Sequence, residues 1–159
     1  MLIRQCQNHV EYEDLADMLH EYILELNQID KGVKVRDIIS LKNEYFYNED
    51  TYFYIIYKNN VPVGFTIIGD NTNCHEDADI YIEEFYIRPL FRREHYGRSL
   101  ILHVLFTHKP DTLCFRILKK NKQAHKFWSI IFSEWSKYNL IDTAPSDNTD
   151  FFSYERRTF

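Results

Sequence analysis

Hydrophobic and polar positions in the first third of the chain follow the two-residue period of a strand and then the period of a helix. Residues 2–6 alternate and predict a first strand. Over residues 12–26 apolar side chains recur every three or four positions, which predicts an amphipathic helix with Asn8 at its N-cap. Residues 34–47 predict a second, shorter helix. Its inward side chains are expected to be Val35, Ile38, Ile39 and Leu41.

The middle of the chain has the pattern of a hairpin. Runs rich in β-branched and aromatic residues at 51–57 and 61–68 are joined by Lys58-Asn59-Asn60, and asparagine tolerates the positive φ of tight turns. Gly64 lies inside the second run and predicts a bulge or a close approach of another backbone. The polar residues 69–79 are expected to form a loop.

Strands and helices are then predicted to alternate. Residues 80–87 predict a buried central strand that Pro89 ends, and a helix is expected to begin near Gly97. Residues 112–118 predict the next strand, after which Asn121 opens another helix.

The C-terminal pattern completes the predicted fold. The last two strands are expected at 135–141 and 150–156, on either side of a loop at 142–148. The whole order predicts a single α/β domain over residues 1–159, with one mixed sheet of about seven strands flanked by about four helices.

Composition restricts the expected partners. A formal net charge of −5 at pH 7 argues against a general nucleic-acid binder, which needs a basic face. No stretch approaches the roughly 20 apolar residues of a membrane span, and the N-terminus lacks a signal-peptide pattern, so a cytoplasmic protein is expected. We further expect a monomer or homodimer that binds neither nucleic acid nor membrane. Cys6, Cys74 and Cys114 are far apart and have no CxxC spacing, so we expect buried or idle thiols, no disulfide framework and no metal site.

A basic turn follows the predicted central strand. Free N–H groups at a helix start carry a partial positive charge, and arginines add paired donors suited to phosphate. The turn therefore predicts a site for a small polyanion, with a solvated basic turn as the alternative. Its basic residues, which stand beside Gly97, are Arg88, Arg92, Arg93, His95 and Arg98.

At these residues the chain resembles the GCN5-related N-acetyltransferase (GNAT) family, whose signature is Arg or Gln, two residues, Gly, one residue, then Gly or Ala. Arg92 to Gly97 fills this signature, with His95 in place of the first Gly. The family's second signature, Asn-x-x-Ala-x-x-Phe-Trp/Tyr, is present from Asn121 to Trp128. Both occur in the family's order with a strand between them, which identifies the chain as a member. The resemblance implies an α/β sandwich whose central strands splay apart.

The resemblance also implies acetyl-CoA as co-substrate, held in the gap between the splayed strands. The strand edge would bond the pantetheine amides through Phe85, Tyr86 and Ile87. The helix start would take the pyrophosphate through Arg92, Arg93, Glu94, His95, Tyr96, Gly97, Arg98 and Ser99. The second signature would place Asn121, Phe127 and Trp128 beside the cofactor, although both aromatic residues also suit a plain helix core.

The family often uses a carboxylate of the central strand to receive the acceptor's proton. Glu83 and Glu84 are adjacent and lie on opposite faces of the strand. The resemblance implies that Glu83 and Tyr81 face the acceptor. Glu83 would then act either as the base or as a group that orients the acceptor. Glu84 is the second choice and would face the helix side or lie at a bulge. Many relatives have a tyrosine at the position of Trp128 that gives a proton to the leaving thiolate, and an indole cannot do so. The resemblance therefore passes the role of this acid to another tyrosine such as Tyr138, to water, or to no residue.

The expected function is an acetyl-CoA-dependent N-acetyltransferase that acetylates a primary amine of a small molecule by direct attack in a ternary complex. One alternative is a catalytically inactive acetyl-CoA-binding sensor or partner subunit. Another is an acetyltransferase for a peptide or protein amine.

Overall fold

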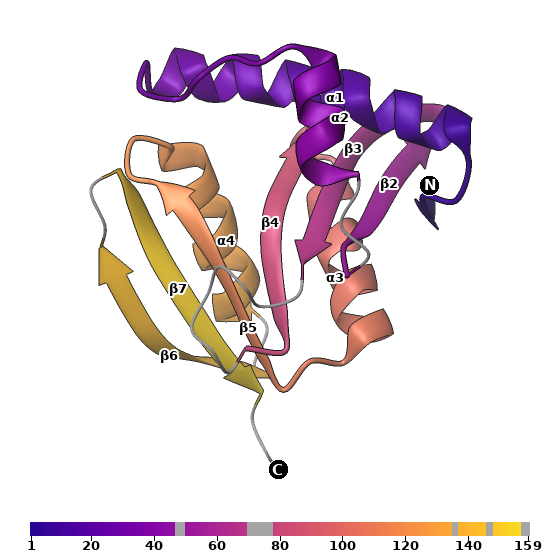
Figure 1. Ribbon diagram of the computed structural model, residues 1–159. Coiled ribbons are helices and arrows are strands. Elements are labelled where there is room, and N and C mark those ends of the chain that lie inside the picture. Colours follow the sequence, from indigo (N-terminus) through magenta and orange to yellow (C-terminus); the bar gives the residue numbers. More distant parts are fainter. Residues whose placement is uncertain (47–49, 70–77, 135–136, 146–147, 157–159) are drawn as a thin grey trace. The chain divides into compact units, whose positions relative to one another are not determined.

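The computed structural model describes five stretches of the chain, which form two compact units (Figure 1). The described residues are 1–46, 50–69, 78–134, 137–145 and 148–156. The first unit holds Met1–Ile68 and Glu84–His108, and the second holds Gly69–Glu83 and Lys109–Phe159.

The described residues form one mixed sheet and four α-helices, as predicted. The strands are β1 (Leu2–Gln5), β2 (Tyr52–Lys58), β3 (Val61–Gly69), β4 (Ile80–Ile87), β5 (Thr112–Leu118), β6 (Tyr138–Pro145) and β7 (Thr149–Arg156). The helices are α1 (His9–Ile29), α2 (Ile38–Tyr45), α3 (Tyr96–His108) and α4 (Lys122–Glu134), with a 3-10 turn η1 (Pro89–Phe91) before α3. Hydrogen bonds join the strands in the order β1-β2-β3-β4-β5-β7-β6. The β4–β5 pair is parallel, whereas β1–β2, β2–β3, β5–β7 and β6–β7 are antiparallel.

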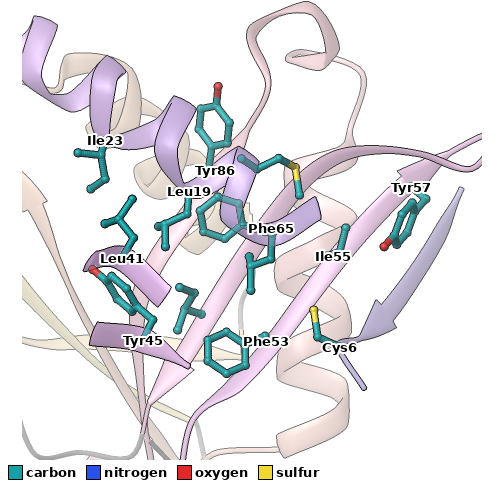
Figure 2. Close-up of a cluster of buried hydrophobic side chains, with 13 residues drawn as sticks. Cys6, Leu19, Ile23, Leu41, Tyr45, Phe53, Ile55, Tyr57, Phe65 and Tyr86 are labelled. Carbon is teal, nitrogen blue, oxygen red and sulfur yellow. The ribbon is translucent and has the colours of Figure 1, made fainter. Parts of the chain in front are cut away.

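The core of the first unit lies between α1, α2 and one face of the strands (Figure 2). The amphipathic pattern of α1 begins after Asn8, whose Oδ1 accepts a 3.0 Å hydrogen bond from the Glu11 amide, as predicted for an N-cap. Alternate residues of β2 turn toward these helices because side chains change face at each step. The 13 clustered side chains are Cys6, Leu15, Met18, Leu19, Ile23, Leu41, Tyr45, Phe53, Ile55, Tyr57, Phe65, Ile67 and Tyr86.

Helix α3 covers the opposite face of β2. Tyr54 alternates with the residues that face α1, and its ring contacts His103 and His108 of α3 at centroid distances of 5.5 and 5.8 Å. Its hydroxyl lies 2.9 Å from Nε2 of His108. The first unit is therefore a sheet layer with helices on both faces.

The β2–β3 hairpin has the predicted turn. Asn59 and Asn60 have φ values of 50° and 64°, which asparagine adopts more readily than most residues. A Cβ on Gly64 would lie 2.6 Å from the Tyr86 carbonyl oxygen, so the predicted close backbone approach is present.

The second unit contains the start of β4, the strands β5, β7 and β6, and α4. The pairing of β4 with β5 covers residues 80–82 against 113–115, and among the described residues it does not continue past Ile82. This short pairing is what splayed central strands require. Phe115 of β5 stacks on Trp128 and Phe132 of α4 at ring-centroid distances of 4.5 and 5.8 Å, so the packing between the strand and the helix is aromatic.

Two details of α2 and β6 differ from the sequence predictions. Helix α2 begins only at Ile38, so Val35 lies before it and is 46% exposed. Ile39 is 72% exposed, because a helix of only two turns buries one stripe, which here is formed by Leu41 and Tyr45. Strand β6 extends to Pro145, so residues 142–145 are not a loop. Polar residues are tolerated there because β6 is the last strand of the sheet.

The cysteines differ from one another. Cys6 is a free buried thiol whose pKa is raised to about 12, mainly by burial. Cys114 is buried and disulfide-bonded, which corrects the prediction of an idle thiol, since spacing along the chain does not show which cysteines the fold brings together. Cys74 lies outside the described residues, as does most of the predicted loop at 69–79.

Candidate functional site

The turn between β4 and α3 is the first part of the candidate site. β4 ends at Ile87, and the amide of Arg88 donates a 2.9 Å hydrogen bond to the Val63 carbonyl. After η1, Arg93 and His95 each have a φ of 65°. These two left-handed residues turn the chain sharply into α3 at Tyr96.

The first turn of α3 presents backbone amides. The Ser99 amide donates a 2.9 Å hydrogen bond to the His95 carbonyl, so the amides of Tyr96, Gly97 and Arg98 lie in the first turn, ahead of the hydrogen-bonded ladder of the helix. With the positive end of the helix dipole, these amides form a place that suits an anion.

Replacing His95 with glycine is expected to stabilise the protein. A left-handed backbone conformation strains a residue that has a Cβ, whereas glycine adopts it without strain. The His95 side chain is exposed, so removing it loses no packing in the core. We expect His95→Gly to raise the free energy of unfolding by about 1 kcal/mol and the melting temperature by about 2–4 °C.

His95→Ala is the matched control for this change. Alanine removes the imidazole but keeps the Cβ, so thermal denaturation should show no comparable gain. An equal gain in both variants would show that the imidazole, and not the backbone conformation, is the source of the strain.

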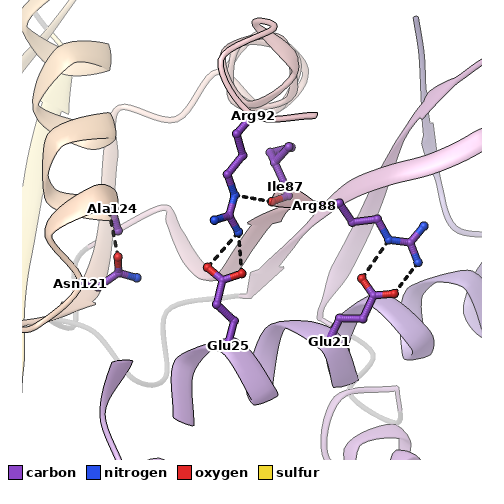
Figure 3. A network of polar contacts seen from close by, with 7 residues as sticks. All are labelled: Glu21, Glu25, Ile87, Arg88, Arg92, Asn121 and Ala124. Atoms are coloured by element: carbon purple, nitrogen blue, oxygen red, sulfur yellow. Dashed lines mark hydrogen bonds and ion pairs between the residues drawn. The ribbon is translucent and has the colours of Figure 1, made fainter. Parts of the chain in front are cut away.

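Arg88 and Arg92 are bonded to carboxylates of α1 (Figure 3). Arg88 makes two hydrogen bonds of 2.9 and 2.7 Å to Glu21. Arg92 makes two bonds of 2.9 and 2.7 Å to Glu25, and its Nε donates to the Ile87 carbonyl at 2.7 Å. The guanidinium of Arg92, predicted to bind phosphate, is therefore engaged inside the first unit.

The remaining side chains of the turn are more exposed. Arg93, Glu94, His95 and Arg98 are exposed, and Ser99 is half-buried. Glu94 forms an ion pair with Lys58 at 3.1 Å. Tyr96 and Gly97 are buried, so these two residues would meet a ligand mainly through their backbone.

The end of β4 carries the predicted strand edge, Phe85 to Ile87. Tyr86 and Ile87 are buried, and the Tyr86 ring belongs to the cluster of Figure 2. Burial and the nearby carboxylates of α1 raise the pKa of Tyr86 to about 12, so it stays protonated. Any contact of Tyr86 with a cofactor would therefore use the backbone.

Glu84 faces the helices of the first unit, as predicted for the second-choice carboxylate. The Tyr45 hydroxyl of α2 donates a 2.5 Å hydrogen bond to Glu84 Oε1. Burial and the Glu84 carboxylate raise the pKa values of Tyr45 and of Tyr22 on α1, so both hydroxyls remain protonated. Two tyrosines that the sequence did not single out thus surround this carboxylate.

Glu83 lies in the second unit against the last residue of β3. A Cβ built on Gly69 would overlap Glu83 Oε1, so the carboxylate occupies the space that the glycine leaves open. Tyr81, two residues earlier and on the same strand face, packs against the cluster of Ala78, Cys114 and Phe151.

The start of α4 carries the second signature. Asn121 Oδ1 accepts a 3.1 Å hydrogen bond from the Ala124 amide and caps the helix (Figure 3). Trp128 is buried in the aromatic packing with Phe115, and Phe127 is half-buried with its ring at 5.1 Å from that of Trp128. Trp128 therefore packs in the core, as one of the two expectations for it stated, and its contact with the cofactor stays a prediction.

Tyr138 is engaged elsewhere in the second unit. Its hydroxyl donates a 2.7 Å hydrogen bond to the Pro110 carbonyl, just before β5, and burial raises its pKa. The residue lines a cavity of about 570 Å³ together with Trp128 and Phe132. This hydroxyl is thus bonded next to the start of β5, and the role of Tyr138 as an acid stays a prediction.

Comparison with known proteins identifies the family. Residues 15–130 match the family model described as "Acetyltransferase (GNAT) family". The chain belongs to the GNAT acetyltransferase family. No curated protein sequence matches the chain significantly.

Solved GNAT structures share the fold. An acetyltransferase from Thermus thermophilus has a TM-score of 0.71 at 12% identity, over 96% of both chains. The PaiA N-acetyltransferase of Thermoplasma acidophilum, in complex with coenzyme A, has a TM-score of 0.65 at 16% identity, over 99% of this chain and 100% of the other. The ribosomal-protein-S18-alanine N-acetyltransferase of Escherichia coli has a TM-score of 0.59 at 12% identity, over 96% and 92%.

Within the described residues of this GNAT chain, no helix is long and apolar enough to cross a membrane. No group of three or more His, Cys, Asp and Glu residues is placed to hold a metal ion within the same residues.

Proposed function

We propose that this GNAT chain is an acetyl-CoA-dependent N-acetyltransferase that acetylates a primary amine of a small molecule by direct attack in a ternary complex. The observation that supports it most is the turn into α3. Two left-handed residues of the family signature, Arg93 and His95, turn the chain into a helix whose first amides lie ahead of the helical hydrogen-bond ladder.

This turn fits the pyrophosphate of coenzyme A. The amides of Tyr96, Gly97 and Arg98 would donate to phosphate oxygens, and the exposed side chain of Arg93 would add positive charge. The backbone of 85–87 would bond the pantetheine, and Asn121, Phe127 and Trp128 would contact it from α4. When bound, acetyl-CoA supplies the acetyl group as a thioester.

The acceptor amine must lose a proton in the reaction. An alkyl amine with a pKa of about 10.4 is mostly protonated at pH 7. Glu83 is our first choice for the group that accepts this proton or orients the ammonium, with Tyr81 beside the acceptor. Glu84 is the second choice, because its carboxylate already accepts a short hydrogen bond from Tyr45.

A small cationic acceptor is supported by charge. The net charge of −5 and two adjacent strand glutamates favour a positively charged partner over an acidic one. Similar folds include an enzyme named for a ribosomal protein's alanine, so a peptide amine is the second acceptor class to test.

Acetyl-CoA is expected to stabilise the fold without any acceptor. At about 100 times its dissociation constant a ligand adds about 2.7 kcal/mol to the free energy of unfolding. For a chain of this size we expect the melting temperature to rise by roughly 5–10 °C in a thermal shift measurement. Phosphate-free acetyl-pantetheine should raise it much less, since the α3 amides would lose their anion.

The outcome separates the candidate functions. No shift with millimolar acetyl-CoA would contradict cofactor binding and with it the proposed function. A shift that is not followed by turnover with any primary amine, small or peptidic, would favour the inactive acetyl-CoA-binding alternative.

A further inference from the structure

Two ion pairs, each with two hydrogen bonds, join α1 to the end of β4 and the turn that follows (Figure 3). Arg88 and Arg92 are four residues apart, and so are their partners Glu21 and Glu25 on α1. Residues four apart share a helix face, so α1 presents both carboxylates on one side. The four residues form what we call the α1 clamp: Glu21, Glu25, Arg88 and Arg92.

The clamp uses most of the donors of its arginines. Beyond its bonds to Glu21, Arg88 donates through Nη1 to the Pro62 carbonyl at 2.6 Å. Arg92 bonds both oxygens of Glu25 and the Ile87 carbonyl, and its guanidinium lies 5.6 Å from the centre of the Tyr86 ring. The Arg92 and Glu25 side chains are only 30% and 27% exposed, so solvent screens this pair less than an open surface pair.

The turn next to the clamp is strained. Arg93 follows Arg92 directly, and it and His95 each have a φ of 65°. Such residues persist only where surrounding contacts fix the backbone. The clamp fixes the chain before the turn, while the Lys58–Glu94 ion pair holds the turn itself.

We propose that Arg88 and Arg92 are positioning residues: clamped by Glu21 and Glu25, they hold the strained turn in its anion-binding shape, and Arg92 is not itself a phosphate ligand. This inference rests on the proposed function, in which the turn binds the pyrophosphate of coenzyme A. It assigns to α1 a role in cofactor binding through residues that do not touch the cofactor.

Glu25→Gln distinguishes positioning from direct contact by the sign of its effect. If Arg92 were a phosphate ligand, removal of the competing carboxylate would free its guanidinium, and coenzyme A would bind more tightly. If Arg92 positions the turn, the loss of the ion pair loosens the turn and coenzyme A binds more weakly. We expect the Kd for coenzyme A, measured by titration calorimetry, to rise about 5–10-fold, within the range of couplings through contacting residues.

Three further variants complete the experiment. Glu13→Gln is the matched control, because Glu13 also lies on α1 but pairs with Lys42 of α2, so the Kd should change less than about twofold. Arg92→Lys keeps a positive charge but loses the planar guanidinium that bonds Glu25 through Nη2 and the Ile87 carbonyl through Nε, so it should weaken binding as Glu25→Gln does. In a protein that already carries His95→Gly, Glu25→Gln should raise the Kd for coenzyme A less than it does in wild type, because glycine removes part of the backbone strain in the turn.

The outcomes are separable. A wild-type protein that does not bind coenzyme A would overturn the proposed function. If wild type binds, unchanged or tighter binding by Glu25→Gln, or normal binding by Arg92→Lys, would overturn the inference and leave the proposed function standing. A lower melting temperature with unchanged Kd would assign the clamp to stability alone, which also overturns it.

Discussion

Glu83→Gln is expected to lower kcat about 10²–10⁴-fold if Glu83 accepts the proton of the acceptor amine. Glutamine keeps the shape and hydrogen-bonding reach of the side chain but cannot take a proton. If Glu83 only orients a cationic acceptor, the loss appears mainly in KM, because that interaction is made equally in the ground state and the transition state. Steady-state kinetics with a saturating and a varied amine concentration separate the two roles.

Two variants control this prediction. Glu84→Gln should change kcat and KM little, because a glutamine carbonyl can still accept the Tyr45 hydrogen bond. Gly69→Ala should reduce activity as Glu83→Gln does, since the new Cβ would overlap the present position of Glu83 Oε1 and must displace the carboxylate. A larger defect in Glu84→Gln than in Glu83→Gln would show that the acceptor lies on the other face of β4.

Gly97→Asp is expected to abolish stabilisation by acetyl-CoA, removing the gain of about 2.7 kcal/mol that a ligand provides at 100 times its Kd. The new carboxylate would lie in the first turn of α3, where phosphate oxygens must approach the amides, and would repel them. A carboxylate at a helix N-terminus is itself favourable, so the protein without cofactor should keep its fold.

Gly97→Ala tests whether charge or bulk causes the loss. Alanine adds one methyl group to the buried position without charge, so it should retain a larger part of the thermal shift than aspartate does. Unchanged coenzyme A affinity in Gly97→Asp would mean that the first turn of α3 is not the anion site.

The parts of the fold that could be predicted from the sequence depend on local signals. The hydrophobic periodicity predicted α1 and the central strand. Asn8 predicted a helix cap through its side chain, and Asn59 and Asn60 predicted a tight turn because asparagine tolerates positive φ. The two signatures, at 92–97 and 121–128, predicted the family, and the family model over residues 15–130 confirms it. Each of these signals lies within a few neighbouring residues, which is why it can be read without a structure.

Features that depend on distant residues could not be predicted. Glu25 is 67 residues from Arg92, and nothing in either segment shows that the arginine of the signature is paired with α1. Likewise Tyr45 and Tyr22 come from two helices and meet at Glu84 only in the folded chain. The exposure of Ile39 and the extension of β6 depend on which neighbour each element finds.

The proposed function is the transfer of acetyl groups from acetyl-CoA to primary amines. Its most direct test is the release of free coenzyme A thiol from acetyl-CoA, measured with a panel of small polycationic and monocationic amines and with peptide amines, while mass spectrometry follows the acetylated product. We expect amine-dependent thiol release with one acetylated amine per thiol, fastest with a small cationic amine. Binding of acetyl-CoA without amine-dependent thiol release across the whole panel would contradict it.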